Sequence, residues 1–320
     1  MLKRMHCQMD ITLAITPIDP ILIKSSYASV SGSQMPFVRI NRGKTFDEVY
    51  IPGSSLKGVI RSHAEKICRT LKDQSVCLPY GDEGEEEFCG SRFKRIENSN
   101  NLKIVNEKAY NLSCPACRTF GSTYFIGRTS ISDAYADPAP FTETRDGVAI
   151  DRRTGGAAKG SGGGAKFDYE VVTHGTFRTD ITLRNFEFWQ WALLAFVLRD
   201  FKDELIRIGS GKSRGLGRIQ GIIEKCTLAY YDRESSLRDL KDFCTPSEIT
   251  AYGLSDFNPT DPPPLPDSET HGLRSVYNLT DSWGGLCQII SPALASYLEN
   301  FDWLGKFKAF EEESRGNFEG

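Results

Sequence analysis

Four cysteines in the first half of the chain have the residue type and spacing of a metal site. Cys114 and Cys117 form a Cys-x-x-Cys pair, and Cys77 and Cys89 precede it. Two thiolates of such a pair can bind one tetrahedral ion, and a site closed by four thiolates stabilises structure without catalysing a reaction. Nine cysteines in a chain that we expect to be cytosolic favour metal binding or free thiols over disulfides. We therefore predict a structural zinc ion at these four positions.

Two features leave the ligand set open. Cys68 and His63 lie on a predicted helix just before these cysteines, and either could replace Cys77 or Cys89 as a ligand. A redox dithiol at Cys114 and Cys117 is the other interpretation, but it normally occurs in a thioredoxin-like context that this sequence lacks.

Residues 51–61, Ile-Pro-Gly-Ser-Ser-Leu-Lys-Gly-Val-Ile-Arg, have the composition of an anion site. Pro52 and Gly53 end a short apolar strand, and Ser54 or Ser55 can cap the helix that follows. The free N–H groups of a helix start bind anions, and Lys57 and Arg61 add positive charge one turn apart. The stretch predicts a phosphate site; the simpler interpretation is a capped amphipathic helix with two solvated cations.

Residues 208–218, Ile-Gly-Ser-Gly-Lys-Ser-Arg-Gly-Leu-Gly-Arg, form a second candidate anion site. A nucleotide-binding P-loop requires glycine where Ile206 stands, and it leaves a strand and enters a helix, whereas this loop does the reverse. We therefore exclude a nucleoside triphosphatase. The glycines can form an anion nest, and Lys212, Arg214 and Arg218 could contact an RNA backbone without reading bases. A flexible basic turn is the alternative.

Residues 146–156, followed by a glycine run, predict a projecting hairpin. Ile150, Arg152 and Arg153 near its tip could wedge between bases and clamp phosphates; alone, the segment could equally be a surface loop.

The composition narrows the class of protein. A chain of 320 residues with 39% hydrophobic residues can bury a large core. The formal charge of -3 argues against a generally basic nucleic-acid binder, so RNA binding would use local basic patches. Lys3 and Arg4 are followed by no apolar run, so we expect neither a secretory signal nor a membrane span. We therefore expect a cytoplasmic location.

The elements that must position these motifs follow a recognisable order. The hydrophobic patterns predict helices over residues 54–71 and 186–206. They predict strands over residues 10–16, 37–40, 124–133, 171–183 and 217–230, and one more strand that ends at residue 51. Without insertions, the order is strand, helix, strand, strand, helix, strand. This order predicts an α+β, ferredoxin-like or RNA-recognition-motif-like βαββαβ core. We expect one domain over residues 1–230 with insertions at about 17–50, 73–122 and 134–168, then an extension over 231–320 with a proline-rich linker at 258–267.

Together, these motifs closely resemble the RAMP superfamily, specifically backbone subunits of type III CRISPR effector complexes. The resemblance covers residues 11–222 and uses the stretches at 51–61, 114–122, 147–155 and 209–218. It implies an antiviral complex in the prokaryotic cytoplasm, in which the partners are guide RNA (crRNA), complementary target RNA and other RAMP subunits. It implies a zinc knuckle at the four cysteines, and a thumb at residues 148–154 that interrupts the guide–target duplex. The residues implied to hold guide phosphates are Ser54, Ser55, Lys57, Arg61, Gly211, Lys212, Ser213 and Arg214.

One departure from the family pattern concerns catalysis. Active members carry an aspartate in the loop after the first strand, but residues 24–35 contain neither carboxylate nor histidine, and Gln34 stands near the expected position. We therefore expect a scaffold that does not cut RNA. The alternative is a metal-dependent endoribonuclease subunit that uses Asp19 or Asp47 with Mg²⁺. More distant alternatives are a standalone guide-processing RNase, for which His6 is the sole nearby histidine, and a zinc protein that binds a small phosphorylated ligand.

Overall fold

The computed structural model describes residues 3–25, 33–43, 45–79, 87–158, 166–232, 236–257, 259 and 264–316. Its strands are β1 (Cys7–Pro17), β2 (Arg39–Arg42), β3 (Thr45–Ile51), β4 (Gly121–Ser122), β5 (Phe125–Ile126), β6 (Thr129–Ile131), β7 (Ala134–Ala136), β8 (Phe141–Val148), β9 (Lys166–His174), β10 (Phe177–Arg184), β11 (Ile219–Tyr230), β12 (Ser268–His271) and β13 (Arg274–Asn278). Its helices are α1 (Gly53–Leu71), α2 (Cys89–Asn100), α3 (Asn106–Leu112), α4 (Pro115–Phe120), α5 (Phe188–Lys202), the 3₁₀ helix η1 (Leu240–Phe243), α6 (Pro246–Tyr252), α7 (Trp283–Ile290), α8 (Pro292–Asn300) and α9 (Trp303–Gly316).

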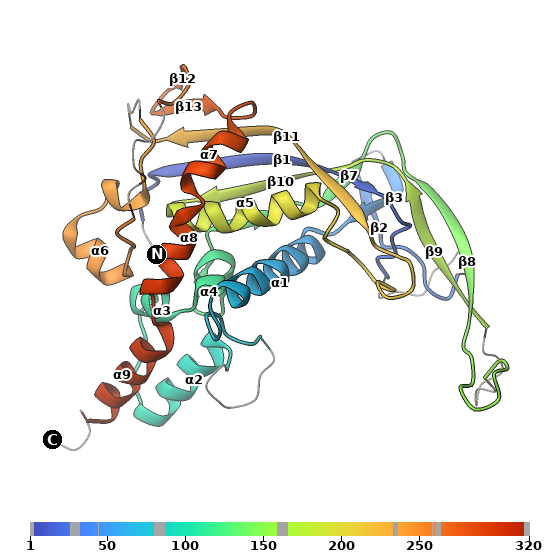
Figure 1. Cartoon of the computed structure of the whole chain (residues 1–320), viewed down its shortest axis with the longest axis horizontal. Coiled ribbons are helices and arrows are strands. Elements are labelled where there is room, and N and C mark those ends of the chain that lie inside the picture. Colours follow the sequence, from blue (N-terminus) through green and yellow to red (C-terminus); the bar gives the residue numbers. More distant parts are fainter. Residues whose placement is uncertain are drawn as a thin grey trace.

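The central sheet has the strand order of a ferredoxin-like fold. β1 pairs antiparallel with β11 on one side and β10 on the other, and β10 pairs antiparallel with β6. β10 therefore lies between β1 and β6, the two strands that α1 connects, which is a split βαβ unit. Figure 1 shows α1 and α5 on the same side of this sheet. The predicted α+β, ferredoxin-like class is confirmed.

The core lies between this sheet and its helices. Alternate residues of β1 are buried because successive side chains of a strand point to opposite faces. Helix α5 is apolar nearly all round, and both the sheet and the C-terminal segment cover it. Trp189 of α5 stacks on Tyr297 of α8, with ring centroids 4.0 Å apart. The residues after Tyr230 therefore pack on the core, and β13 extends the sheet by pairing with β11.

The opposite face of the sheet is a polar network. Thr12 donates a hydrogen bond to Asp180 across β1 and β10, and Thr182 donates one to Asp10, both at 2.7 Å. RNA-recognition folds stack bases on aromatic side chains of this face. Here Gln8, Asp10 and Thr12 occupy the outward positions of β1. The similarity to RNA-recognition folds thus extends to the topology but not to this surface.

Several predicted element bounds need correction. The predicted strand 171–183 is two strands, β9 and β10, because the chain turns between them at Gly175 (φ +132°). The predicted strand 124–133 is the two short strands β5 and β6. Residues 73–122, which lack sustained periodicity, contain the short helices α2, α3 and α4. Helix α1 begins at Gly53 with Pro52 as its N-cap, so Ser54 and Ser55 lie in its first turn and do not cap it.

The predicted hairpin at residues 146–156 is part of a long two-stranded arm. β8 pairs with β9 from Phe141 opposite His174 to Val148 opposite Lys166. Figure 1 shows this arm projecting from the rest of the molecule. Residues 159–165 of the predicted glycine run, and residues 258 and 260–263 of the predicted proline-rich linker, lie outside the described residues.

Two glycines of α1 provide a matched test of its docking. A Cβ at Gly53 would lie 2.6 Å from the Ile131 carbonyl oxygen, whereas a Cβ at Gly58 would meet nothing within 4 Å. We expect Gly53→Ala to lower the free energy of unfolding by about 2 kcal/mol because the helix must shift from β6. We expect Gly58→Ala to raise it by up to about 1 kcal/mol through helix propensity. Urea unfolding of both variants measures the difference, and equal effects would contradict the close approach.

Candidate functional site

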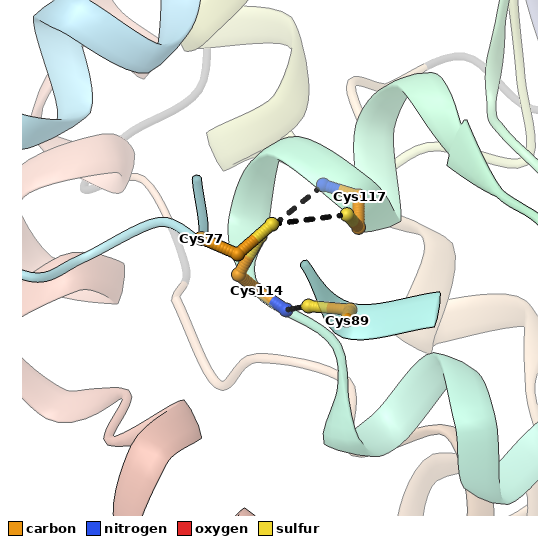
Figure 2. A group of neighbouring side chains, drawn as sticks. All are labelled: Cys77, Cys89, Cys114 and Cys117. Carbon is orange, nitrogen blue, oxygen red and sulfur yellow. Dashed lines mark hydrogen bonds between the residues drawn. The ribbon is translucent and has the colours of Figure 1, made fainter. Parts of the chain in front are cut away.

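The four predicted cysteines lie together and are buried. Their Sγ atoms are all within 4.8 Å of one another. The Sγ atom of Cys77 is 3.5 Å from that of Cys114 and 3.6 Å from that of Cys117. Figure 2 shows the four side chains converging from a loop, the start of α2 and the start of α4. Cys114 also caps α4, because its sulfur accepts a hydrogen bond from the Cys117 N–H at 3.5 Å.

These distances fit a tetrahedral metal site. Thiolates about 2.3 Å from a central ion lie about 3.8 Å from one another, close to the separations found here, whereas a disulfide would need about 2.05 Å. Burial raises the pKa of the Cys89 thiol, so a thiolate at Cys89 needs a cation to offset its charge. The predicted alternative ligands are elsewhere: Cys68 is outside the group, and His63 contacts Asp200 at 2.6 Å.

Arg61 joins this cluster to α1. Its guanidinium donates hydrogen bonds to the Cys117 sulfur at 3.3 Å, to the Gly121 carbonyl oxygen at 3.0 Å and to the Glu65 carboxylate at 2.9 Å. Arg69, two turns further along α1, donates to the Cys77 carbonyl oxygen at 2.9 Å. The motif at residues 51–61 predicts that Arg61 contacts RNA phosphates, whereas in the structure its guanidinium has partners inside the protein.

Loss of the Arg61 guanidinium should weaken the cluster. Burial raises the pKa of Glu65, whose side chain is 6% exposed, so this carboxylate depends on Arg61 for its charge. We expect Arg61→Gln to lower the free energy of unfolding by about 2 kcal/mol and to accelerate metal loss to a chelator. Adding Glu65→Gln should restore part of the stability because it removes the uncompensated charge. Unchanged stability of Arg61→Gln would contradict this role.

The start of α1 presents hydroxyls and one lysine at the surface. Gly53 donates its N–H to the Asp133 carboxylate at 2.7 Å, so the first N–H of the helix has an internal partner. Ser54 and Ser55 are exposed, and Lys57 is half-buried. Asp133 was missed by the sequence analysis, since an acidic residue eighty positions away gives no local signal.

The glycine-rich loop packs against the chain that follows β1. Ser210 donates its N–H to the Leu22 carbonyl oxygen at 2.7 Å, and Gly217 donates to that of Pro20 at 2.9 Å. Gly209 has φ +73°, and a Cβ there would lie 2.2 Å from the Leu22 oxygen, so only glycine fits. The loop is therefore held at both ends, while Lys212, Ser213 and Arg214 are exposed. These contacts favour a formed loop over a flexible turn.

Lys57 and Lys212 are cations that the described residues leave without an anionic partner. Within the described part of the chain, neither has an ion pair or a side-chain hydrogen bond. Burial lowers the pKa of both lysines, helped by Arg61 for Lys57 and by Lys66 for Lys212. Because Lys66 belongs to α1, this helix and the loop bring cations near one another at Lys66 and Lys212. We use the name basic ridge for the cations of the two elements: Lys57 at the start of α1, Lys66 further along it, and Lys212 and Arg214 of the loop. A bound anion would relieve the repulsion along it.

Arg218 does not belong to the basic ridge. It forms ion pairs with Asp19 at 3.3 Å and with Glu204 at 3.6 Å. The candidate carboxylates Asp19 and Asp47 are therefore both paired, because Asp47 contacts Arg39 at 3.2 Å.

A third carboxylate, which the sequence analysis missed, lies beside Gln34. Asp168 of β9 accepts a hydrogen bond from the Gln34 N–H at 3.1 Å. Residues 26–32 of the loop before Gln34 lie outside the described residues.

The segment after β1 brings these parts together. Ile21 bridges to Val172 of β9, Leu22 accepts from the glycine-rich loop, and Ile23 accepts from the Val38 N–H. The base of the arm, the glycine-rich loop and the segment just before β2 thus meet around residues 20–23. At the far end of the arm, Ile150 is 59% exposed, and Arg152 and Arg153 are exposed.

The family comparison agrees with this arrangement. Residues 15–220, more than half of the chain, match the RAMP superfamily. The chain belongs to the RAMP superfamily. The resemblance drawn from the motifs is thereby confirmed at the level of the superfamily. No curated protein matches the chain.

Membership of the RAMP superfamily gives the protein a CRISPR-associated, RNA-binding role within multi-subunit complexes. Within the described residues, every helix is too short or too polar to cross a bilayer.

Proposed function

We propose that this RAMP protein is a backbone subunit of a type III CRISPR effector complex in the prokaryotic cytoplasm. In this proposal it holds the phosphates of the guide RNA and inserts its β8–β9 arm into the guide–target duplex. Its partners are the guide RNA, the target RNA and neighbouring RAMP subunits. The observation that carries the proposal is the basic ridge, in which the cations Lys57 and Lys212 have no internal partner among the described residues.

The proposed phosphate contacts come from two elements. Ser54, Ser55 and Lys57 at the start of α1, with Gly211, Lys212, Ser213 and Arg214 of the loop, offer hydroxyls, N–H groups and charge that fit a backbone of repeated phosphates. We leave Arg61 and Arg218 out of this set, because the structure engages both with internal partners.

The arm has the chemistry of a duplex wedge. Exposed Ile150 could enter between base pairs, and Arg152 and Arg153 on the adjacent turn could contact the flanking phosphates. The tip is ordered by its own bonds, since the Asp151 carboxylate accepts from the Arg153 N–H at 2.8 Å.

We propose zinc as the ion of the cysteine cluster. Four thiolates in tetrahedral arrangement are a typical zinc site, and a closed site stabilises structure. Cys77, Cys89, Cys114 and Cys117 would hold the ion, which would fix the segment between α1 and β4.

We further propose that this subunit does not cleave the target. Asp19 and Asp47 are held in ion pairs, and Gln34 can neither accept a proton nor neutralise a metal ion. An assembled complex carrying Asp19→Ala, Asp47→Ala or Asp168→Ala in this subunit should cut labelled complementary RNA at the wild-type positions and rates. Loss of one cut with assembly intact would make the subunit a Mg²⁺-dependent endoribonuclease and would contradict the proposal.

A further inference from the structure

A groove of about 610 Å³ opens between α5, β11 and α7. Its volume lies within the range of small-ligand sites. Ala192 and Ala195 of α5 contribute small side chains to it, and Phe196 of α5 and Trp283 of α7 contribute aromatic rings. Both rings are half-buried, so each keeps a surface open to the groove. Trp283 is supported from behind by Trp191, with ring centroids 6.0 Å apart.

The charge of the groove is one-sided. Among the described residues that line it, Arg199 and Lys202 in the last turn of α5 are the charged ones, and none is a carboxylate. Arg199 lies over the Phe196 ring at 5.1 Å and pairs with Asp200 at 2.9 Å. Lys202 is exposed, and its ammonium has no partner within the described part of the chain. An occupant with a flat apolar body and a negative group would match both features.

The groove lies next to the basic ridge in the chain. Lys202 ends α5, and the glycine-rich loop with Lys212 follows a few residues later. Gln220 at the start of β11 donates to the Lys202 carbonyl oxygen at 3.4 Å, which holds the end of α5 against the strand that leaves the loop. A phosphate backbone on the loop can therefore continue past Lys202.

We propose that this groove binds one unpaired nucleotide of RNA that lies along the basic ridge. The base packs against Phe196 and Trp283, and Lys202 contacts its phosphate. The small side chains of Ala192 and Ala195 leave room for the ring. Stacking of this kind tolerates any base, because every base has a flat face. The inference rests on the proposed RNA-binding function and assigns it a site that the sequence motifs do not include.

Photo-crosslinking with the full, metal-loaded chain tests the proposal. Single-stranded RNA containing 5-iodouridine is irradiated with the protein, and the adduct is mapped by mass spectrometry. We expect adducts at Trp283 or Phe196. We also expect Trp283→Leu and Lys202→Glu each to lower RNA affinity about tenfold. Lys225→Glu, an equal charge change at an exposed site of β11, should leave affinity and melting temperature unchanged.

The outcomes separate this inference from the proposed function. If wild-type protein binds no RNA, both fail. If wild-type protein and Lys202→Glu bind RNA equally and no adduct forms in the groove, only the inference fails; Lys202 is at the surface, so this holds even if Trp283→Leu does not fold. If uridine 5′-monophosphate occupies the groove and RNA does not displace it, the groove is a site for free nucleotides and the inference is overturned.

Discussion

Replacing Cys114 with serine should remove the metal ion and lower the melting temperature by about 10 °C or more. Structural zinc sites contribute about 10–16 kcal/mol of apparent binding free energy at neutral pH, and each lost kcal/mol lowers the midpoint by about 2–4 °C in domains of about 150–250 residues and by less in a longer chain. Cys114 contributes both a ligand and the cap of α4, so its loss affects the cluster and the adjacent helix. Elemental analysis of the purified variant and a thermal melt measure the two effects.

Cys68→Ala is the matched control for this experiment. Cys68 is fully buried on α1 but lies outside the cluster. We expect this variant to keep one metal ion per chain and to lose only the packing of one small side chain, roughly 1–2 kcal/mol. If Cys68→Ala loses the ion while Cys114→Ser keeps it, the ligand assignment is wrong.

Reversing two charges of the basic ridge should abolish most RNA binding. We expect Lys57→Glu combined with Lys212→Glu to weaken the affinity for single-stranded RNA about a hundredfold or more, since each lost charge-assisted phosphate contact contributes roughly tenfold. The dependence of log affinity on log salt should become shallower by about 0.7 for each lost contact. Fluorescence anisotropy at several salt concentrations gives both quantities.

A double variant with the same net charge controls for non-specific effects. Lys103→Glu with Lys225→Glu changes two exposed lysines on other parts of the surface. We expect this protein to bind RNA within about threefold of the wild-type affinity and with the same salt dependence. Equal losses in the two double variants would mean that net charge, and not the basic ridge, controls binding.

The sequence predicted the topology well because its signals were local. Alternation along β1 and the helical pattern of α1 are readable within a single element, and the order of such elements defines the ferredoxin-like class. The Cys-x-x-Cys pair was equally local. The choice between Cys77 and Cys68 was not, because it depends on which of the two lies beside Cys89, Cys114 and Cys117 in the folded chain.

The roles of the basic residues could not be predicted from residue type alone. Arg61 and Arg218 have the same chemistry as Arg214, and all three lie in motifs that resemble phosphate sites. Their internal partners distinguish Arg61 and Arg218, and these include distant ones: Cys117 lies 56 residues from Arg61, and Asp19 lies 199 residues from Arg218. Such pairings depend on the folded chain. The same is true of Asp168. It lies beside Gln34 because β9 runs next to the segment that contains Gln34 in the folded chain.

The central claim is that this protein holds an RNA backbone, and the most direct test is the dependence of its affinity on RNA length. Single-stranded RNAs of increasing length and unrelated sequence are titrated against the metal-loaded chain at low and moderate salt. We predict that affinity increases with length, does not depend on sequence and decreases with salt, while mononucleotides compete poorly. If a mononucleotide competes as well as a long RNA, the chain is instead a zinc protein for a small phosphorylated ligand, and the account is contradicted.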